Sequence, residues 1–307
     1  MKRITVFKGL SILCAMMFFF SCSKNGDNNS VTNSEPTKML CFANFDELND
    51  TYLSLFNLTR DEFEVWAIEN NHESLYMSDT DADYKNFSNS LRRILNKDGK
   101  YQVGDSVYMI DKSGDVFAYK KGQKNDTKLV DHVVSMPLDE FNNSSLKYIS
   151  ISVGQKGPAD YQQQFNLTNY AYNACNGITK SANGALFKFV HELWVENYNN
   201  QYIAYLRLKL EYASKWNEAS EFRNIILSLT LYNQNGSYIK SISESLKCVR
   251  YHYEYLLFTT NNGDSNYWTG SKVRFSLTGS ITHQVVKDSY IFYNDVNDKW
   301  GLYATYN

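Results

Sequence analysis

The stretch YIAYLRLKLEY, residues 202–212, decides the fold class because its side chains alternate in character. Apolar or aromatic residues occupy every second position, namely Tyr202, Ala204, Leu206, Leu208, Leu210 and Tyr212. Arg207, Lys209 and Glu211 stand between them. Successive side chains of a β-strand point to opposite faces, so this period of two predicts a strand with one buried face and one face in water.

The sequence that follows repeats this pattern. Residues 225–231 alternate in the same way and precede Asn235-Gly236, a dipeptide typical of a tight hairpin turn. Further strands are expected at residues 246–259, 272–282 and 289–293, with a closing strand near Leu302. Several strands joined by short polar turns, without helices between them, predict an antiparallel β-sandwich over residues 184–307.

Residues 39–120 show a different pattern, that of short helices followed by a hairpin. Asn44 stands three residues before Glu47, which is the spacing of a helix-capping box. Thr59 and Glu62 repeat the spacing at the start of a second apolar-periodic segment. Three helices are expected: from Asn44 to about residue 57, from Thr59 onward, and at about residues 84–96.

A strand pair is expected after the helices. Residues 106–110 can pair with residues 116–120 across the turn DKSG, where the glycine supplies a positive φ. Residues 121–183 then form a mixed connection, in which residues 153–177 are expected to be a long irregular segment. The predicted fold is therefore α+β, with a helical cap and hairpin at 39–120 ahead of a mainly antiparallel β-sandwich.

The helical part also resembles a known family. The segment CFANFDELNDTYLSLFNLTRDEFEVWAIENNHESLY, followed by ILNKDGKYQVGDSVYMIDKSGDVFAYKK, is similar to the amino-terminal part of a family of uncharacterised Bacteroidetes lipoproteins with a domain of unknown function. The matching residues are Trp66, Ser74, Leu75, Asn96, Asp98, Gly99, Gly104 and Asp105. The resemblance covers residues 40–120 well and the rest by general character. It implies structural motifs and brings no known activity.

The amino terminus has the character of a targeting segment. Lys2, Arg3 and Lys8 give it positive charge, and residues 9–20 form a twelve-residue apolar core. Such a core is too short to cross a hydrocarbon layer of ~30 Å as a permanent helix. We therefore expect a signal peptide over residues 1–21.

The end of this core points to a lipid anchor. Ser21 directly precedes Cys22, and bulky Phe19 and Phe20 stand where simple secretion requires small residues. The arrangement resembles the lipobox of bacterial lipoproteins, with Phe19 in place of the usual Leu, and implies lipid, palmitate among its acyl chains, on Cys22. Because each buried methylene contributes ~0.8 kcal/mol, two or three acyl chains hold a protein at a membrane permanently. The alternative is an ordinary secreted protein with an incidental cysteine.

Residues 22–38 are expected to be a disordered tether, since Val31 is their only large apolar side chain. A flexible coil of about 16 residues spans roughly 20–25 Å on average. Ser23 follows the lipid-bearing cysteine, which in the lipoprotein family favours the outer membrane. The predicted location is therefore the outer membrane, with the body either periplasmic or surface-exposed.

Composition excludes some partners. Removal of residues 1–21 changes the formal net charge from −2 to −5, and no basic patch indicates binding to nucleic acid. Cys41, Cys175 and Cys248 remain, too widely spaced for a disulfide framework or a zinc site, so one bridge or three buried thiols are both open. The 24 tyrosines and 18 phenylalanines favour β-structure.

The segment SDTDADY places Asp79, Asp81 and Asp83 at alternate positions, as at the start of a calcium loop. A full loop requires glycine at its sixth position and glutamate at its twelfth, where this chain has Tyr84 and Ser90. The three aspartates more simply cap the following helix. We expect no cofactor.

No catalytic motif is complete. In FVHELW, His191 and Glu192 lack the second histidine of a zinc protease, because position 195 is valine. His191 alternates with apolar residues and is predicted to be a structural strand residue. The chain contains neither a G-x-S-x-G nucleophile motif nor a glycine-rich phosphate loop. A hydrolase built from distant carboxylates remains an alternative, since paired acids need only meet in space.

Aromatic residues in polar loops suggest a binding role. The candidates are Tyr267, Trp268 and Asp264 in NNGDSNYWTG, and Trp300 in NDVNDKWG. Such side chains can stack on sugar rings or anchor a protein partner, or else belong to an aromatic core. We therefore expect a non-catalytic, lipid-anchored envelope protein that binds a glycan or a protein partner. The alternatives are a polysaccharide-directed hydrolase and a structural subunit of an envelope assembly.

Overall fold

The computed structural model describes residues 38–78, 81–121, 127–137, 161–167, 170–173, 179–182, 185–198, 201–212, 217–269, 272–285 and 291–295. These residues form mainly antiparallel sheets with a few short helices, which confirms the β-rich class predicted from the sequence. The predicted signal peptide, Cys22, nearly all of the tether and the strand near Leu302 lie outside this part. Within it, no helix has the length and apolar character that crossing a membrane requires.

The helices begin at the residues that the capping pattern indicates. They are α1 (Phe45–Ser54), α2 (Arg60–Glu69) and α3 (Asn89–Ile94), with the 3₁₀ turns η1 (Leu75–Met77) and η2 (Asp81–Tyr84). Asn44 accepts a hydrogen bond from the Glu47 amide, and Thr59 forms the full capping box with Glu62. The third helix is shorter than predicted. It starts after Ser88, which caps it in place of the aspartates at 79–83.

A small sheet follows the helices in the chain. Its order is β1 (Cys41–Phe42), β2 (Lys100–Val103), β3 (Ser106–Ile110), β4 (Asp115–Lys120) and β5 (Thr127–His132). The pair β1 and β2 is parallel, and the other pairs are antiparallel. Gly99 precedes β2 with φ +74°, and a Cβ there would lie 2.7 Å from the Ile110 carbonyl oxygen. This turn therefore requires glycine.

Two larger sheets contain the long strands. The first has the order β12 (Asn217–Glu218), β11 (Gln201–Tyr212), β10 (Ala185–Tyr198) and β6 (Val134–Pro137), with β15 (Tyr253–Asn261) also paired to β11 and β7 (Tyr161–Leu167) to β10. The second has the order β14 (Tyr238–Val249), β13 (Arg223–Asn233), β18 (Phe275–Val285) and β19 (Ile291–Asp295). Two short pairs join β8 (Tyr170–Asn173) with β9 (Thr179–Ala182), and β16 (Trp268–Thr269) with β17 (Lys272–Val273).

Two expectations about the strands were wrong. The segment 153–177, expected to be irregular, contains β7 and β8. The sequence pattern of β7 does not indicate a strand, but β7 is held as one by its pairing with β10. The single strand expected at 246–259 is two strands, β14 and β15. Cys248 (φ 63°), next to the last residue of β14, and Tyr251 (φ 61°), between the two strands, adopt left-handed conformations where the first strand ends and the chain turns.

One hydrophobic cluster lies between the two larger sheets. It combines inward side chains of β10 and β11, such as Leu193 and Leu206, with those of β13 and β18, such as Leu227 and Leu277. Full burial of a side chain of this size contributes about 1.5–3 kcal/mol. The apolar face predicted for residues 202–212 therefore packs against the second sheet.

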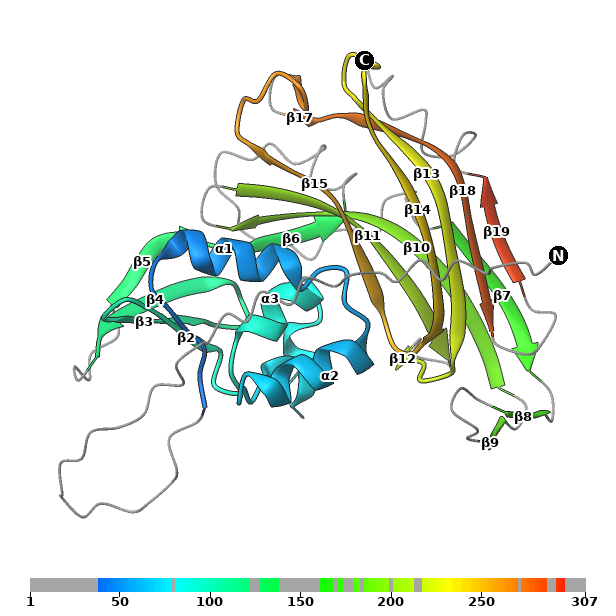
Figure 1. Cartoon of the computed structure of the whole chain (residues 1–307), viewed down its shortest axis with the longest axis horizontal. Coiled ribbons are helices and arrows are strands. Elements are labelled where there is room, and N and C mark those ends of the chain that lie inside the picture. Colours follow the sequence, from blue (N-terminus) through cyan, green and yellow to red (C-terminus); the bar gives the residue numbers. More distant parts are fainter. Residues whose placement is uncertain are drawn as a thin grey trace, which may run out of the picture.

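The opposite face of β10 and β11 is covered as well. The helices lie on this face of the sheet (Figure 1). A second cluster packs Tyr52 and Phe56, from α1 and its C-terminal end, against Tyr198 and Tyr205 of the first large sheet. The face containing Arg207 was expected in water, but Arg207 is only 4% exposed. The expectation was wrong because the helical cap, remote in sequence, lies on that face.

Candidate functional site

The covered face of β10 and β11 presents a row of charged residues. Strand pairing places Glu192 opposite Arg207 and Lys188 opposite Glu211. Arg207 is in turn opposite Glu254 of β15. Side chains directly opposite each other in an antiparallel pair lie about 4.5–5.5 Å apart at Cβ, so charges of opposite sign meet along this face.

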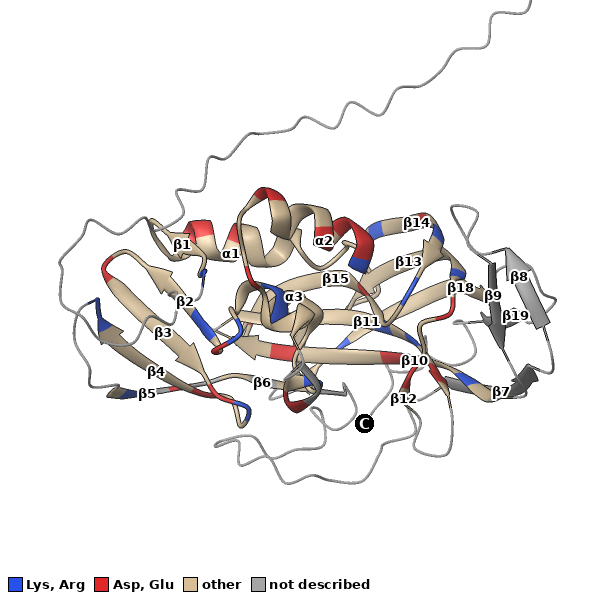
Figure 2. Cartoon of the chain, turned by 90° about the horizontal axis from the view of Figure 1, so that it is seen from below, with Lys and Arg blue, Asp and Glu red and all other residues tan. Residues whose placement is uncertain are grey.

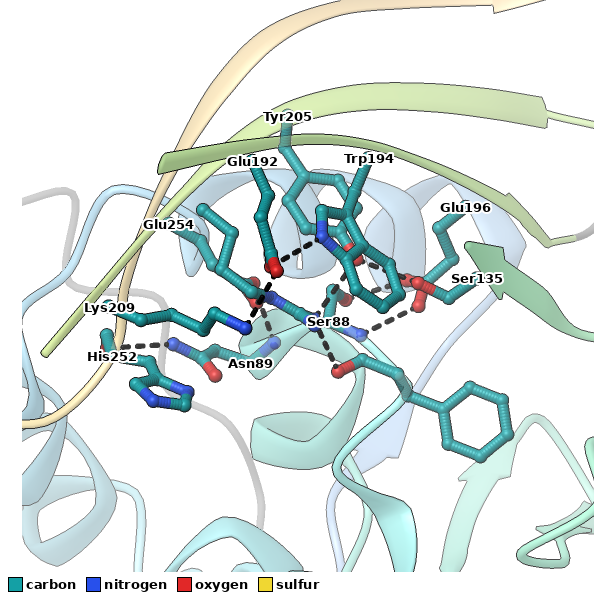
Figure 3. Close-up of polar contacts among 12 residues, drawn as sticks. Ser88, Asn89, Ser135, Glu192, Trp194, Glu196, Tyr205, Lys209, His252 and Glu254 are labelled. Carbon is teal, nitrogen blue, oxygen red and sulfur yellow. Dashed lines mark hydrogen bonds and ion pairs between the residues drawn. The ribbon is translucent and has the colours of Figure 1, made fainter. Parts of the chain in front are cut away.

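Buried ion pairs join these residues, and Figure 3 shows the pair of Lys209 and Glu192. Arg207 Nε lies 2.8 Å from Glu254 Oε1, and Lys209 Nζ lies 2.7 Å from Glu192 Oε1. Lys209 also contacts Glu211 at 3.1 Å. Glu211 in turn pairs with Lys188 at 2.9 Å. The signs alternate along the row, which offsets the cost of removing each charge from water.

Arg207 makes further contacts beyond its carboxylate. Its Nη2 donates to the Phe87 carbonyl at 3.0 Å and to the Tyr205 hydroxyl at 3.2 Å. Its Cζ lies 3.9 Å from the centre of the Trp194 ring, which is a cation–π geometry. Phe87 belongs to the segment just before α3. Arg207 therefore links the sheet to the helical cap.

Two sheet carboxylates bind the amino end of α3. Glu196 accepts hydrogen bonds from the Ser88 amide at 2.8 Å, from Ser88 Oγ at 2.6 Å and from the Tyr52 hydroxyl. Glu254 accepts one from the Asn89 amide at 2.7 Å. The first amides of a helix have no partner inside the helix, and negative charge is favoured there. The sheet therefore caps the helix through side chains.

Burial and charge shift the pKa values in this cluster in different directions. Burial raises the pKa of Glu196, against the hydrogen bonds from Ser88 and Tyr52. For Glu192, burial acts in the same direction, but Lys209 and Arg207 outweigh it and the pKa is lowered. The pKa of Lys209 is raised, because Glu192 and Glu211 outweigh the effect of burial. The pair of Glu192 and Lys209 is therefore held in its charged form.

The cluster serves to attach the cap to the sheet. Glu192, Glu196, Glu211 and Glu254 each accept at least one bond from the chain itself. Glu192 also accepts a hydrogen bond from Trp194 Nε1 at 2.9 Å. In the part of the chain that the structure describes, no group of three or more His, Cys, Asp and Glu residues is arranged to hold a metal ion.

The aromatic loop predicted as a binding site lies in the core. Tyr267 and Trp268 are 8% and 7% exposed and belong to the cluster between the two larger sheets. Tyr267 stacks on Phe258 with ring centres 3.9 Å apart, and Trp268 meets Tyr202 edge-on at 4.8 Å. Asp264 accepts the Asn266 amide at 2.9 Å with its carboxylate and so shapes the turn.

The other predicted residues are scattered. Cys22, Asp79 and Trp300 lie outside the described residues, Asp81 begins η2, and Asp83 is exposed within it. His191 is a buried residue of β10, as predicted, and its Nε2 lies 3.1 Å from His283 Nδ1. Of these candidates, the described ones lie in different elements, η2 and β10.

Sequence reasoning missed the charged cluster, although part of its signal is visible. In residues 187–196, FKFVHELWVE, the charged residues Lys188, Glu192 and Glu196 fall on one face of a strand, as do Arg207, Lys209 and Glu211 in residues 202–212. A hairpin between the two segments sets Lys188 opposite Glu211 and Glu192 opposite Arg207. Complementary charges at matched positions on two adjacent strands therefore indicate a pairing. The sequence gives no comparable sign that Ser88 and Asn89 donate to the carboxylates of the sheet.

Comparisons with known proteins add little to this geometry. No family model matches the chain, and no curated protein matches it. A crystal structure of a DUF4848 family protein from Bacteroides thetaiotaomicron covers 83% of this chain and 95% of its own, at 10% identity and a TM-score of 0.20. A TM-score this low carries no argument about fold or function. The described chain is a mainly antiparallel β protein with a small helical cap.

Proposed function

We propose that this protein is a non-catalytic, lipid-anchored component of the cell envelope whose β-sandwich body binds a protein partner. The observation that carries the proposal is the closed charged cluster. Its carboxylates are buried and bonded to Arg207, Lys209, Ser88 and Asn89, so they hold the body together and do not face a substrate. A glycosidase, in contrast, needs two carboxyl groups facing its substrate.

Two features support placement in the envelope. The lipobox-like end of the signal segment at Cys22 implies a lipid anchor. Cys41 in β1 and Cys248 in β14 each take part in a disulfide bond. Disulfide bonds persist in oxidising compartments such as the bacterial periplasm and cell surface.

The side chains exposed on the surface favour a protein partner over a glycan. Glycan recognition by stacking needs open aromatic faces, whereas Tyr267 and Trp268 are buried. On α2, Val65 and Ile68 are 56% and 79% exposed and stand one helical turn apart. α1 and α2 both have acidic residues in their first turns (Figure 2). An exposed apolar pair on a helix that also presents acidic side chains suits a partner with an apolar centre and basic residues.

The lipid anchor is tested by changing Cys22. The Cys22→Ala variant should leave the membrane fraction and lose incorporation of labelled palmitate, while the wild-type protein keeps both. A variant that remains membrane-bound and lipid-labelled would refute the anchor.

The partner surface is tested by crosslinking in intact cells. A crosslinked envelope protein should be lost when Val65 and Ile68 are both changed to Ser, and kept in the control Ile226→Ser, which alters an exposed residue of β13. Binding to a glycan array that both variants retain would favour the glycan alternative. Hydrolysis of a polysaccharide that is lost in Glu192→Gln would favour the enzyme.

A further inference from the structure

Arg223, the first residue of β13, is a buried cation that forms no ion pair with a carboxylate of the described residues. It is fully buried, and its Nη2 donates to the Tyr251 carbonyl. Among the described residues, its Nε and Nη1 have no hydrogen-bond partner, and no carboxylate forms an ion pair with it. Arg207 is similarly buried but is paired with Glu254. Buried charges are normally paired, whereas in the described part of the chain Arg223 has no carboxylate at ion-pair distance.

A histidine pair lies next to Arg223. Strand pairing puts Arg223 opposite Val285 and Ile225 opposite His283, so Arg223 and His283 are diagonal neighbours on one face of the sheet. His283 Nδ1 lies 3.1 Å from His191 Nε2. Within the described chain, the buried His283 Nε2 has no partner. When His191 donates to Nδ1, the neutral His283 ring carries its proton on Nε2 and offers a donor.

Two carboxylates, Glu218 and Glu221, act electrostatically on Arg223 without forming an ion pair with it. Burial lowers the pKa of Arg223 to about 10, against the opposing effects of Glu218, Glu221 and Tyr76. Glu218 is itself 3.5 Å from His252 Nδ1. After burial, Arg223 is the largest cause of the lowered pKa of His283, ahead of His191.

Tyr76 provides a further buried hydroxyl, and it interacts electrostatically with Arg223. Its side chain is buried, and its hydroxyl has no partner among the described residues. Its ring is lined by cations, with Arg60, Arg92 and Arg93 at 5.2, 5.1 and 4.7 Å from the ring centre. A hydroxyl in such a field can donate to an anion.

We propose that Arg223 is the centre of a buried binding site for a small inorganic anion of the size of chloride, with His283 and Tyr76 as additional donors. The guanidinium offers Nε and Nη1, while Nη2 is held by the Tyr251 carbonyl. Tyr251 and Cys248 keep left-handed conformations in the turn that supplies this carbonyl. Such strained residues persist where the surroundings fix them, here around the arginine. Full burial of Arg223 and His283 favours a monatomic anion over a larger oxyanion.

The test measures urea unfolding of the mature protein in detergent at constant ionic strength, with sodium gluconate replaced stepwise by sodium chloride. Above the dissociation constant, each tenfold rise in chloride should lower the unfolding equilibrium constant about tenfold. Arg223→Met should remove this dependence and Tyr76→Phe should weaken it. The control Arg250→Met, in the same turn but paired with Asp61, should keep it.

Equal unfolding in chloride and gluconate would overturn the proposal, as would a chloride dependence that survives Arg223→Met. If Arg223→Met does not fold, the wild-type protein alone tests the proposal, through its unfolding in chloride and gluconate and through crystallography with bromide. Crystals grown in bromide should show an anomalous peak within hydrogen-bond distance of Arg223 Nε or Nη1. Water at that position in place of bromide would contradict the site.

Discussion

Glu254 shows how one residue connects two distant parts of the chain. One carboxylate oxygen accepts from Arg207 Nε on the neighbouring strand, and the other accepts from the Asn89 amide in the helical cap. Glu254 itself is fully buried. Loss of its charge therefore leaves a buried cation without its counter-charge, and an amide in its place offers one acceptor oxygen where two donors need one each.

The Glu254→Gln variant tests this role. It should lower the free energy of unfolding by about 3–5 kcal/mol, the usual cost of breaking a buried pair from one side. The control Glu64→Gln removes the partly exposed pair with Arg60 and should cost no more than about 0.5 kcal/mol. Urea unfolding measures both. Similar losses in the two variants would contradict the importance of the buried pair.

His72 makes stability depend on pH. Its Nε2–H donates to the Arg93 carbonyl at 2.7 Å, and burial lowers its pKa from 6.5 to about 4. The unfolded chain therefore binds a proton first as pH falls. The contribution of His72 is complete above about pH 6.5 and is lost between about pH 6.5 and pH 4, amounting to roughly 3 kcal/mol.

The His72→Gln variant, which keeps a donor for the Arg93 carbonyl, should show a shallower fall in unfolding free energy over that pH range. His252 and His283 also have lowered pKa values and act in the same direction, so only the difference between wild type and variant reports His72. Parallel pH profiles for the two proteins would show that His72 does not titrate in this way.

At the scale of elements, the residues that cap helices and the alternation that marks strands could be predicted from the sequence. Whether each face of a strand is covered or lies in water could not. Asn44, Thr59 and the alternation in residues 202–212 act within a few residues, and each correctly predicted an element. The burial of Arg207 depends on α3 and Phe87, more than 100 residues away in the chain. Local pattern contains no information about such a neighbour.

Ser88 provides a prediction for one element, α3. Its Oγ accepts the Leu91 amide at 3.0 Å and donates to Glu196 at 2.6 Å. Ser88→Ala should therefore cost more than the typical ~1 kcal/mol of a lost cap, because buried Glu196 also loses a donor. Thr59→Ala, which removes an exposed capping box on α2, should cost about 1 kcal/mol. Equal costs in urea unfolding would contradict the coupling to Glu196.

At the scale of the whole molecule, the long hairpin of β10 and β11 is the shared centre. One of its faces packs against the second large sheet, and the other binds the helical cap through ion pairs and aromatic contacts. The predicted loop site failed to emerge because Tyr267 and Trp268 fill the first of these cores. An aromatic residue in a polar loop looks the same in sequence whether it faces water or the interior.

In this arrangement the helical cap and the sheet should unfold together, as one cooperative unit. Native-state hydrogen exchange measures this cooperativity directly, through the opening free energies of the Ser88, Asn89 and Leu91 amides beside those of the central amides of β10 and β11. We expect both groups of amides to exchange only by global unfolding, with equal opening free energies and equal dependence of these energies on urea. A cap that exchanges at a much lower free energy than the sheet would contradict this expectation.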